Sequence, residues 1–245
     1  MSSNSKASAR AQKAAEMRAA QKKRETRRRI LTIGGVVVVM ALIIGGSIGV
    51  SLLNKKEVKA AAAGSSAYGV TIGKEDAPHS VVIYEDFLCP FCRQLESATR
   101  SDLESLAADG KVFVEYRPFD LLSQGTGSDY PIRAAGAFSI VLDKSGPEIA
   151  KKFHDLLYEN QPSEQNPDVV TDADLVALAV KAGASESDVK AAIEAGEGAD
   201  WVTKATKEAH DSGVSSTPTV LLDGQLFQDG RTIDDIAKNL VAAVD

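Results

Sequence analysis

The chain has 245 residues, of which 44% are hydrophobic and 25% are charged, and its formal net charge is −6. These values are typical of a globular protein with one or two domains. The sequence contains two cysteines, which excludes a zinc site or an iron–sulfur cluster held by four cysteines of this chain.

The charge is divided unevenly along the chain. Residues 1–29 contain ten basic and two acidic residues, whereas residues 30–245 contain 18 basic and 32 acidic residues. The first part therefore carries a net charge of +8 and the second a net charge of −14. We interpret residues 1–29 as a basic cytoplasmic tail attracted to anionic lipid, and we expect no nucleic-acid partner.

Residues 30–53 contain no charged side chain over 24 positions. As a helix they would extend about 36 Å, which exceeds the roughly 30 Å of a bilayer core and predicts one transmembrane anchor. Residues 22–29, before the predicted anchor, are more basic than the residues after it, which include Lys55, Lys56 and Lys59. The N-terminus is therefore predicted to be cytoplasmic, and the domain after the anchor extracytoplasmic. A cleaved signal peptide is the alternative, because small residues occur at positions 60–64.

After the anchor, residues 54–67 change from charged residues to Ala, Gly and Ser, a composition that favours a flexible linker. Residues 68–245 are then predicted to form one folded domain, which is long enough to bury a hydrophobic core of its own.

The first part of this domain has the pattern of a strand, a helix and a second strand. The apolar run at residues 81–84 indicates a strand buried on both faces. Pro90 suits the first turn of a helix that is predicted to extend to about Ala108, with Gly110 as its stop signal. The stretch from Lys111 predicts a second strand, parallel to the first and joined by a right-handed crossover.

The next part, about residues 129–211, is rich in Ala and is predicted to be an inserted helical subdomain. Helix starts are indicated at Gly146-Pro147-Glu148, at Thr171 and at Ser185, the last two with an acidic residue three positions later. Strand sequence then returns, with Asp223-Gly224 as a hairpin turn, before a last helix capped by Thr232.

The two cysteines, Cys89 and Cys92, are three positions apart and follow the first strand. A structural disulfide would close a very small loop and constrain the unfolded chain little. A metal site would have to recruit further ligands from His79, His154 and His210 or from another subunit, so we expect no metal.

A redox pair is favoured by the position of the cysteines at the start of a helix. If Pro90 is the first helical residue, Cys89 is the N-cap, and the free amides of Phe91 and Cys92 together with the helix dipole stabilise its thiolate. The thiolate is the nucleophile of disulfide exchange. Cys92, one turn later, is placed to attack the mixed disulfide. We therefore expect Cys89 to be the exposed nucleophile and Cys92 its shielded partner.

The segments "YEDFLCPFC" and "GVSSTPTVLLDG" resemble the disulfide oxidoreductases of the thioredoxin superfamily, specifically the DsbA-like group. The resemblance implies an α/β thioredoxin-like fold with an inserted helical subdomain, here preceded by one transmembrane helix. It also implies that Cys89 attacks and Cys92 resolves, and that Pro218 is a cis proline beside them. Thr217 would offer backbone hydrogen bonds to an extended substrate chain.

The sequence departs from this family at two places. Between the cysteines it has Pro90-Phe91 where strong oxidants often have Pro-His, so one side-chain donor to the thiolate is absent. Thioredoxin has a buried acid six residues before its first cysteine, where this chain has Ile83. Glu85 and Asp86 lie closer to the turn, and they either assist proton transfer or are solvated acids at the end of a strand.

Other residues near the motif have simpler interpretations. Arg93 is expected to be a solvated helix residue, although it could support the thiolate. His154 and His210 are expected to be packing or surface residues. Phe87, Leu88 and Phe91 could form an apolar patch for unfolded clients, and core packing is the alternative for the first two.

The favoured function is a membrane-tethered enzyme that forms disulfides in exported proteins by exchange at Cys89 and Cys92, without a cofactor. Its expected partners are unfolded exported proteins that contain cysteines and, as the family implies, a quinone-linked membrane oxidase of the DsbB or VKOR type. The alternatives are a reductase or isomerase of the same fold, and a non-catalytic tethered binding module or holdase.

Overall fold

The computed structural model describes residues 58–245 of the chain. The predicted basic tail, the predicted anchor at residues 30–53 and the first part of the predicted linker lie outside the described residues. Between residues 58 and 245, no helix is both long enough and apolar enough to cross a membrane.

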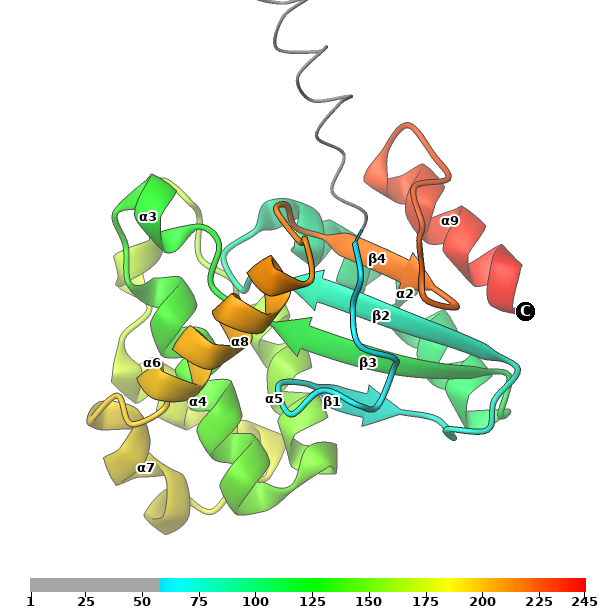
Figure 1. Ribbon diagram of the computed structural model, residues 1–245. Helices are drawn as coiled ribbons and strands as arrows, with labels where there is room; N and C mark the ends of the chain where they lie inside the picture. The colour runs from blue at the N-terminus through cyan, green and yellow to red at the C-terminus, as the bar shows by residue number, and fades with distance from the viewer. Residues whose placement is uncertain (1–57) are drawn as a thin grey trace, which may run out of the picture. The chain divides into compact units, whose positions relative to one another are not determined.

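The domain is built on a five-stranded mixed sheet with the order β1-β3-β2-β4-β5 (Figure 1). The strands are β1 (Val70–Ile72), β2 (His79–Glu85), β3 (Val112–Pro118), β4 (Thr219–Leu222) and β5 (Gln225–Leu226). The central strands β2 and β3 run parallel, as predicted, while β1 is antiparallel to β3 and β4 is antiparallel to β2. The longest strands are therefore at the centre of the sheet.

Helices connect and cover these strands (Figure 1). They are α2 (Pro90–Ala108), α3 (Ser123–Thr126), α4 (Tyr130–Ser145), α5 (Pro147–Glu159), the 3-10 turn η1 (Pro167–Val169), α6 (Asp172–Ala182), α7 (Glu186–Glu194), α8 (Ala199–Asp211) and α9 (Ile233–Val244). The crossover α2 packs against α9, while α3 to α8 all lie between β3 and β4. The chain is thus a strand-helix-strand unit and a terminal hairpin with a helical insertion between them.

The alternation of side chains along β2 explains why it is buried on both faces. Val81 and Ile83 belong to the larger core with Leu95 of α2 and Leu240 of α9. The intervening Val82 and Tyr84 join a second cluster, in which residues of α8 cover the other face of the sheet. The apolar run at residues 81–84 therefore packs against helices on both sides, which confirms the interpretation of a central strand.

Several local signals in the sequence have the structures that we expected. The helix that follows Cys89 and contains Cys92 begins at Pro90 and ends at Ala108. Thr171 and Thr232 each form a reciprocal capping box, with Asp174 and Asp235 respectively. Asp223 and Gly224 form the turn between β4 and β5 with positive φ angles of 50° and 75°.

The expectation for Ser185 was only partly correct. Ser185 is the N-cap of α7, but its side chain makes no capping hydrogen bond and instead contacts the Ser187 hydroxyl at 2.9 Å. A neighbouring hydroxyl therefore replaces the backbone amide as its partner.

Residues 58–64 lie within the predicted flexible linker, yet they are held against the sheet. Arg117 of β3 donates hydrogen bonds to the carbonyl oxygens of Ala61 and Ala62 at 3.1 and 2.9 Å. The Gly64 amide donates to Glu115 at 2.7 Å, and the Lys59 amide donates to the Ser212 carbonyl at 2.9 Å. This segment, which we call the strap, is thus part of the folded domain rather than a free tether.

Candidate active site

The turn between β2 and α2 is organised by Asp86. Its carboxylate accepts hydrogen bonds from the amides of Leu88 and Leu121 at 2.8 Å each and from the amide of Leu122 at 3.0 Å. Asp86 thereby ties the turn that carries the cysteines to the loop that follows β3. Burial raises the pKa of Asp86 to about 6, although these three hydrogen bonds oppose the shift. The contacts support an anchoring role for Asp86.

Glu85 is also fully buried, so neither acid is a solvated group at the end of a strand. That alternative is wrong because β2 ends inside the protein, where the helical insertion covers its last residues. Proton transfer by Glu85 or Asp86 stays a prediction.

Cys89 is the N-cap of α2, with the extended backbone angles φ −71° and ψ 118°, and Pro90 follows as the first helical residue. The hydrogen bond from the Cys92 thiol is the main cause that lowers the pKa of Cys89 to about 7. Burial opposes this effect, while Thr217 and the amides of Cys92 and Phe91 add to it. The Cys89 sulfur accepts no hydrogen bond of full geometry from either amide. The two amides therefore act on the sulfur mainly as nearby dipoles.

Cys92 lies one helical turn further along and is 1% exposed, and burial raises its pKa well above the ordinary thiol value. Cys89 is only 4% exposed itself, so the expectation of an exposed nucleophile was wrong. The surroundings of the two thiols differ, because the pKa of Cys89 is lowered to about 7 and that of Cys92 is raised. Both are thiols in this structure, which is the reduced state of the pair.

The loop before β4 lies against this pair. The peptide bond between Thr217 and Pro218 is cis, and the Cys89 sulfur is 3.5 Å from the Thr217 carbonyl oxygen. Thr219, the first residue of β4, pairs with Tyr84 of β2, so this loop is positioned by the same sheet that positions the cysteines. The structure therefore brings together residues that are 128 positions apart in the sequence.

The side chains around the motif separate into exposed and buried groups. Phe91 is 57% exposed and Arg93 is also exposed, so Arg93 is a solvated helix residue as expected. Phe87 and Leu88 are fully buried. An apolar patch made of all three residues is therefore not formed, because only Phe91 reaches the surface.

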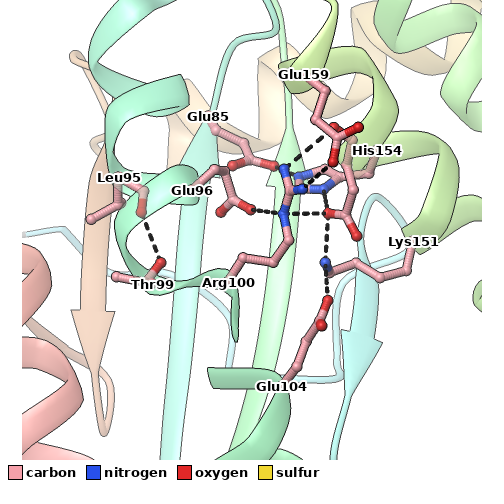
Figure 2. A network of polar contacts seen from close by, with 10 residues as sticks. Glu85, Leu95, Glu96, Thr99, Arg100, Glu104, Lys151, His154 and Glu159 are labelled. Atoms are coloured by element: carbon pink, nitrogen blue, oxygen red, sulfur yellow. Dashed lines mark hydrogen bonds and ion pairs between the residues drawn. The ribbon is translucent and has the colours of Figure 1, made fainter. Parts of the chain in front are cut away.

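Behind the cysteines lies a buried network of charged groups, shown in Figure 2. His154 of α5 is fully buried and makes an ion pair with Glu85 through Nε2 and a 3.0 Å contact with Asp155 through Nδ1. Burial alone would lower the pKa of His154, but the nearby carboxylates outweigh it and raise the value to about 9. His154 is thus a buried cation, and His210 is exposed at the surface of α8.

Glu96 of α2 borders the same network. Burial and the charge of Glu85 raise the pKa of Glu96 to about 7, and its nearest cation is Arg100, whose Nε is 4.0 Å away. Arg100 is itself paired with Asp155 at 3.3 Å and with Glu159 at 2.8 Å, so the network extends from the core to the surface of α5.

Glu85, Glu96 and His154 have the donor types of a metal site, and their donor atoms lie within 4.8 Å of one another. His154 Nε2 is, however, already bonded to Glu85, and Arg100 and Lys151 supply positive charge at the same place. Both carboxylate oxygens of Glu96 nevertheless lack a hydrogen-bond partner, and the expectation of no metal stays a prediction.

The helix α5 contributes contacts to the active-site turn that the sequence analysis did not identify. The Tyr158 hydroxyl donates to the Asp86 carbonyl at 3.3 Å, and Gln161 donates to the carbonyls of Phe87 and Cys89 at 2.9 and 3.0 Å. His154 and Tyr158 are four positions apart on one face of α5, and Gln161 follows two residues after the end of the helix. The spacing is visible in the sequence, but nothing there shows which face meets the cysteines.

The chain matches the thioredoxin family profile over residues 65–242. The chain belongs to the thioredoxin family. The chain is also similar to the crystal structure of reduced DsbA from Mycobacterium tuberculosis, with 27% sequence identity and a TM-score of 0.61. The match covers 73% of this chain and 91% of the DsbA chain. Together with the profile match, this similarity confirms the thioredoxin-like fold.

Two curated relatives are informative about function. The probable disulfide bond formation protein D of Bacillus cereus is 28% identical over 185 residues, which cover 74% of this chain and 82% of that protein. The serine/threonine-protein kinase PknE of Mycobacterium tuberculosis is 28% identical over 158 residues. Those residues cover 62% of this thioredoxin-family chain, but the chain spans only 28% of the length of the kinase.

Proposed function

We propose that this protein is a thiol:disulfide oxidoreductase that forms disulfides in exported proteins by exchange at Cys89 and Cys92. The observation that carries the proposal is the asymmetry of the pair at the N-terminus of α2. The pKa of Cys89 is lowered to about 7, whereas that of Cys92 is raised by burial. Disulfide exchange requires one thiol that ionises readily and a second that is held in reserve. The relatives named for disulfide bond formation support the same chemistry.

The reaction follows from this asymmetry. A client thiolate attacks the Cys89 sulfur of the oxidised pair, the bond between Cys89 and Cys92 breaks, and Cys92 leaves with the electron pair and takes up a proton. A second client thiolate then attacks the client sulfur of the mixed disulfide and forms the client's disulfide. Cys89 leaves as a thiolate, and its low pKa makes it a good leaving group. Two electrons have passed from the client to the enzyme.

The reduced enzyme must return these electrons to an oxidant. The proposed partner is a quinone-linked membrane oxidase of the DsbB or VKOR type, which accepts two electrons and regenerates the disulfide. The proposed clients are unfolded exported proteins that contain cysteines. The exposed Phe91 beside the cysteines offers an apolar contact for such chains.

Trapping of mixed disulfides tests this function. In Cys92→Ala the Cys89 thiolate can still attack a client disulfide and release one client thiolate, but no Cys92 thiol is present to free Cys89 again. Disulfide-linked clients should therefore accumulate on Cys89 when the full-length variant is expressed in its native envelope. Cys89→Ala is the matched control and should trap none. A Cys89→Ala protein that still prevents client aggregation as well as the native protein would favour the holdase alternative.

The location is part of the proposal and rests on the charge pattern of the sequence. Residues 30–53 would be a single-pass anchor, the N-terminal tail would be cytoplasmic and the catalytic domain extracytoplasmic. Protease added to intact cells stripped of any outer envelope should then digest the domain. Protection of all residues after Leu53, with digestion only after lysis, would contradict this topology.

A further inference from the structure

We propose that Gln161 is a positioning residue of the active site, which holds the peptide units of Phe87 and Cys89 so that the Cys89 sulfur faces the N-terminus of α2. The inference rests on the proposed function, because it concerns the reactivity of Cys89. It assigns to the helical insertion a direct role in that reactivity.

The contacts of Gln161 are specific to the cysteine turn. Its side-chain nitrogen donates to the Phe87 carbonyl at 2.9 Å and to the Cys89 carbonyl at 3.0 Å. Because both partners can only accept hydrogen bonds, the amide must present its NH2 group, whose two hydrogens match the two carbonyls. A single side chain therefore fixes the Phe87–Leu88 and Cys89–Pro90 peptide units.

The Cys89 carbonyl is also the first acceptor of the helix. It receives the Arg93 amide at 3.2 Å in addition to the Gln161 side chain. The orientation of this peptide unit sets where the Cys89 sulfur lies relative to the amides of Phe91 and Cys92. Those amides lower the pKa of Cys89, so a residue that holds the peptide unit also maintains their effect.

Gln161 is itself held by the insertion. It lies two residues after α5, and its own amide donates to the Tyr158 carbonyl at 3.3 Å. It also lines a groove of about 870 Å³ between the first turns of α2 and the segment 161–165. The residue therefore connects the insertion to the turn from a half-buried position, where a substitution removes the donor without opening a cavity in the core.

The test compares Gln161→Leu with Asn160→Leu in the reduced full-length protein. Asn160 is one residue away and also donates its side-chain amide to a carbonyl, at 2.8 Å, but that carbonyl belongs to Leu156 of its own helix. The rate of Cys89 alkylation by iodoacetamide is measured against pH by mass spectrometry of the Cys89 peptide. Thermal unfolding of each variant is measured in parallel.

In the native protein and in Asn160→Leu, the alkylation midpoint should lie near pH 7. In Gln161→Leu it should rise by about one unit, which at pH 7 makes alkylation about fivefold slower because less thiol is ionised. Gln161→Lys retains N–H donors, so its midpoint should stay at or below that of the native protein. If Gln161 only stabilised the fold, its substitution would lower the unfolding temperature but would not raise the alkylation midpoint in Gln161→Leu alone.

An unchanged midpoint in folded Gln161→Leu, or an equal rise in Asn160→Leu, would overturn the assignment of Gln161. If Gln161→Leu does not fold, Gln161→Met decides, because it has a similar length and also lacks the N–H donors: a raised midpoint in that variant supports the role of the donor and an unchanged one contradicts it. A native midpoint near 8.5, the value of a free thiol, would instead count against the proposed function itself.

Discussion

At the scale of single residues, the chemistry depends on a difference between two thiols that are one helical turn apart. Cys89 is placed at a helix N-terminus beside the Thr217 carbonyl, and Cys92 is enclosed by the core. The sequence predicted this pair because Pro90 marks the start of the helix. It could not predict the burial of His154, because the ion pair with Glu85 joins residues 69 positions apart.

The buried ion pair between Glu85 and His154 leads to a prediction about stability and pH. His154→Gln removes the cation and leaves Glu85 buried without its partner, which should lower the free energy of unfolding by about 3–5 kcal/mol near neutral pH. The folded-state pKa of His154, about 9, lies above its ordinary value of 6.5. The stabilisation by His154 is therefore fully present below about pH 6.5 and is lost as the pH rises through about 9.

Denaturant unfolding of the reduced proteins at pH 6 and pH 9.5 checks this prediction. The difference in stability between the native protein and His154→Gln should be larger at pH 6. His79→Gln is the control, since His79 is 38% exposed and its pairing with Asp223 should contribute about 0–1 kcal/mol. A difference for His154→Gln that is equal at both pH values would show that His154 is not a buried cation.

At the scale of elements, the boundaries that carry strong local signals were predictable. Pro90 starts α2, Thr232 caps α9, and Asp223-Gly224 turns the terminal hairpin, because each residue type has a specific backbone or capping preference. The strap was not predictable. Its Ala, Gly and Ser composition resembles a linker, and its attachment depends on Glu115 and Arg117, which are distant in sequence.

Arg117→Met should release the strap. Arg117 is 2% exposed, pairs with Glu115 at 2.6 Å and donates to two strap carbonyls, so its loss leaves a buried carboxylate without a cation. We expect a loss of about 3–5 kcal/mol in the free energy of unfolding. Hydrogen exchange of the Lys59 and Gly64 amides should become faster, because both depend on the attachment of the strap.

The control is Lys111→Met, which removes a surface pair between side chains that are 43% and 68% exposed. That change should leave both the free energy of unfolding and the exchange of the strap amides nearly unchanged, because solvent screens the exposed pair. Equal protection of Lys59 and Gly64 in the native protein and in Arg117→Met would contradict the attachment described here.

At the scale of the whole molecule, the sheet and the insertion converge on the turn between β2 and α2. The sheet brings the loop with Thr217 to one side of Cys89, and Gln161, just after α5, holds the carbonyls of Phe87 and Cys89. The fold class was predictable from the order of strands and helices together with the motifs at Cys89 and Pro218. The role of the insertion was not, since a pattern of helix-forming residues does not specify which face contacts the active site.

The direction of electron flow is the central claim, and the reduction potential of the full-length protein tests it most directly. Lowering the pKa of Cys89 from 9.0 to about 7 stabilises the reduced pair by about 10 mV at pH 7, where half of the thiol is ionised, and by up to about 60 mV well above pH 9. Because the proposed function is to oxidise client thiols outside the cytoplasm, equilibration with glutathione buffers should give a potential above the −270 mV or so of thioredoxin. A potential at or below about −270 mV would contradict the account and assign the protein to the reductases of the same fold.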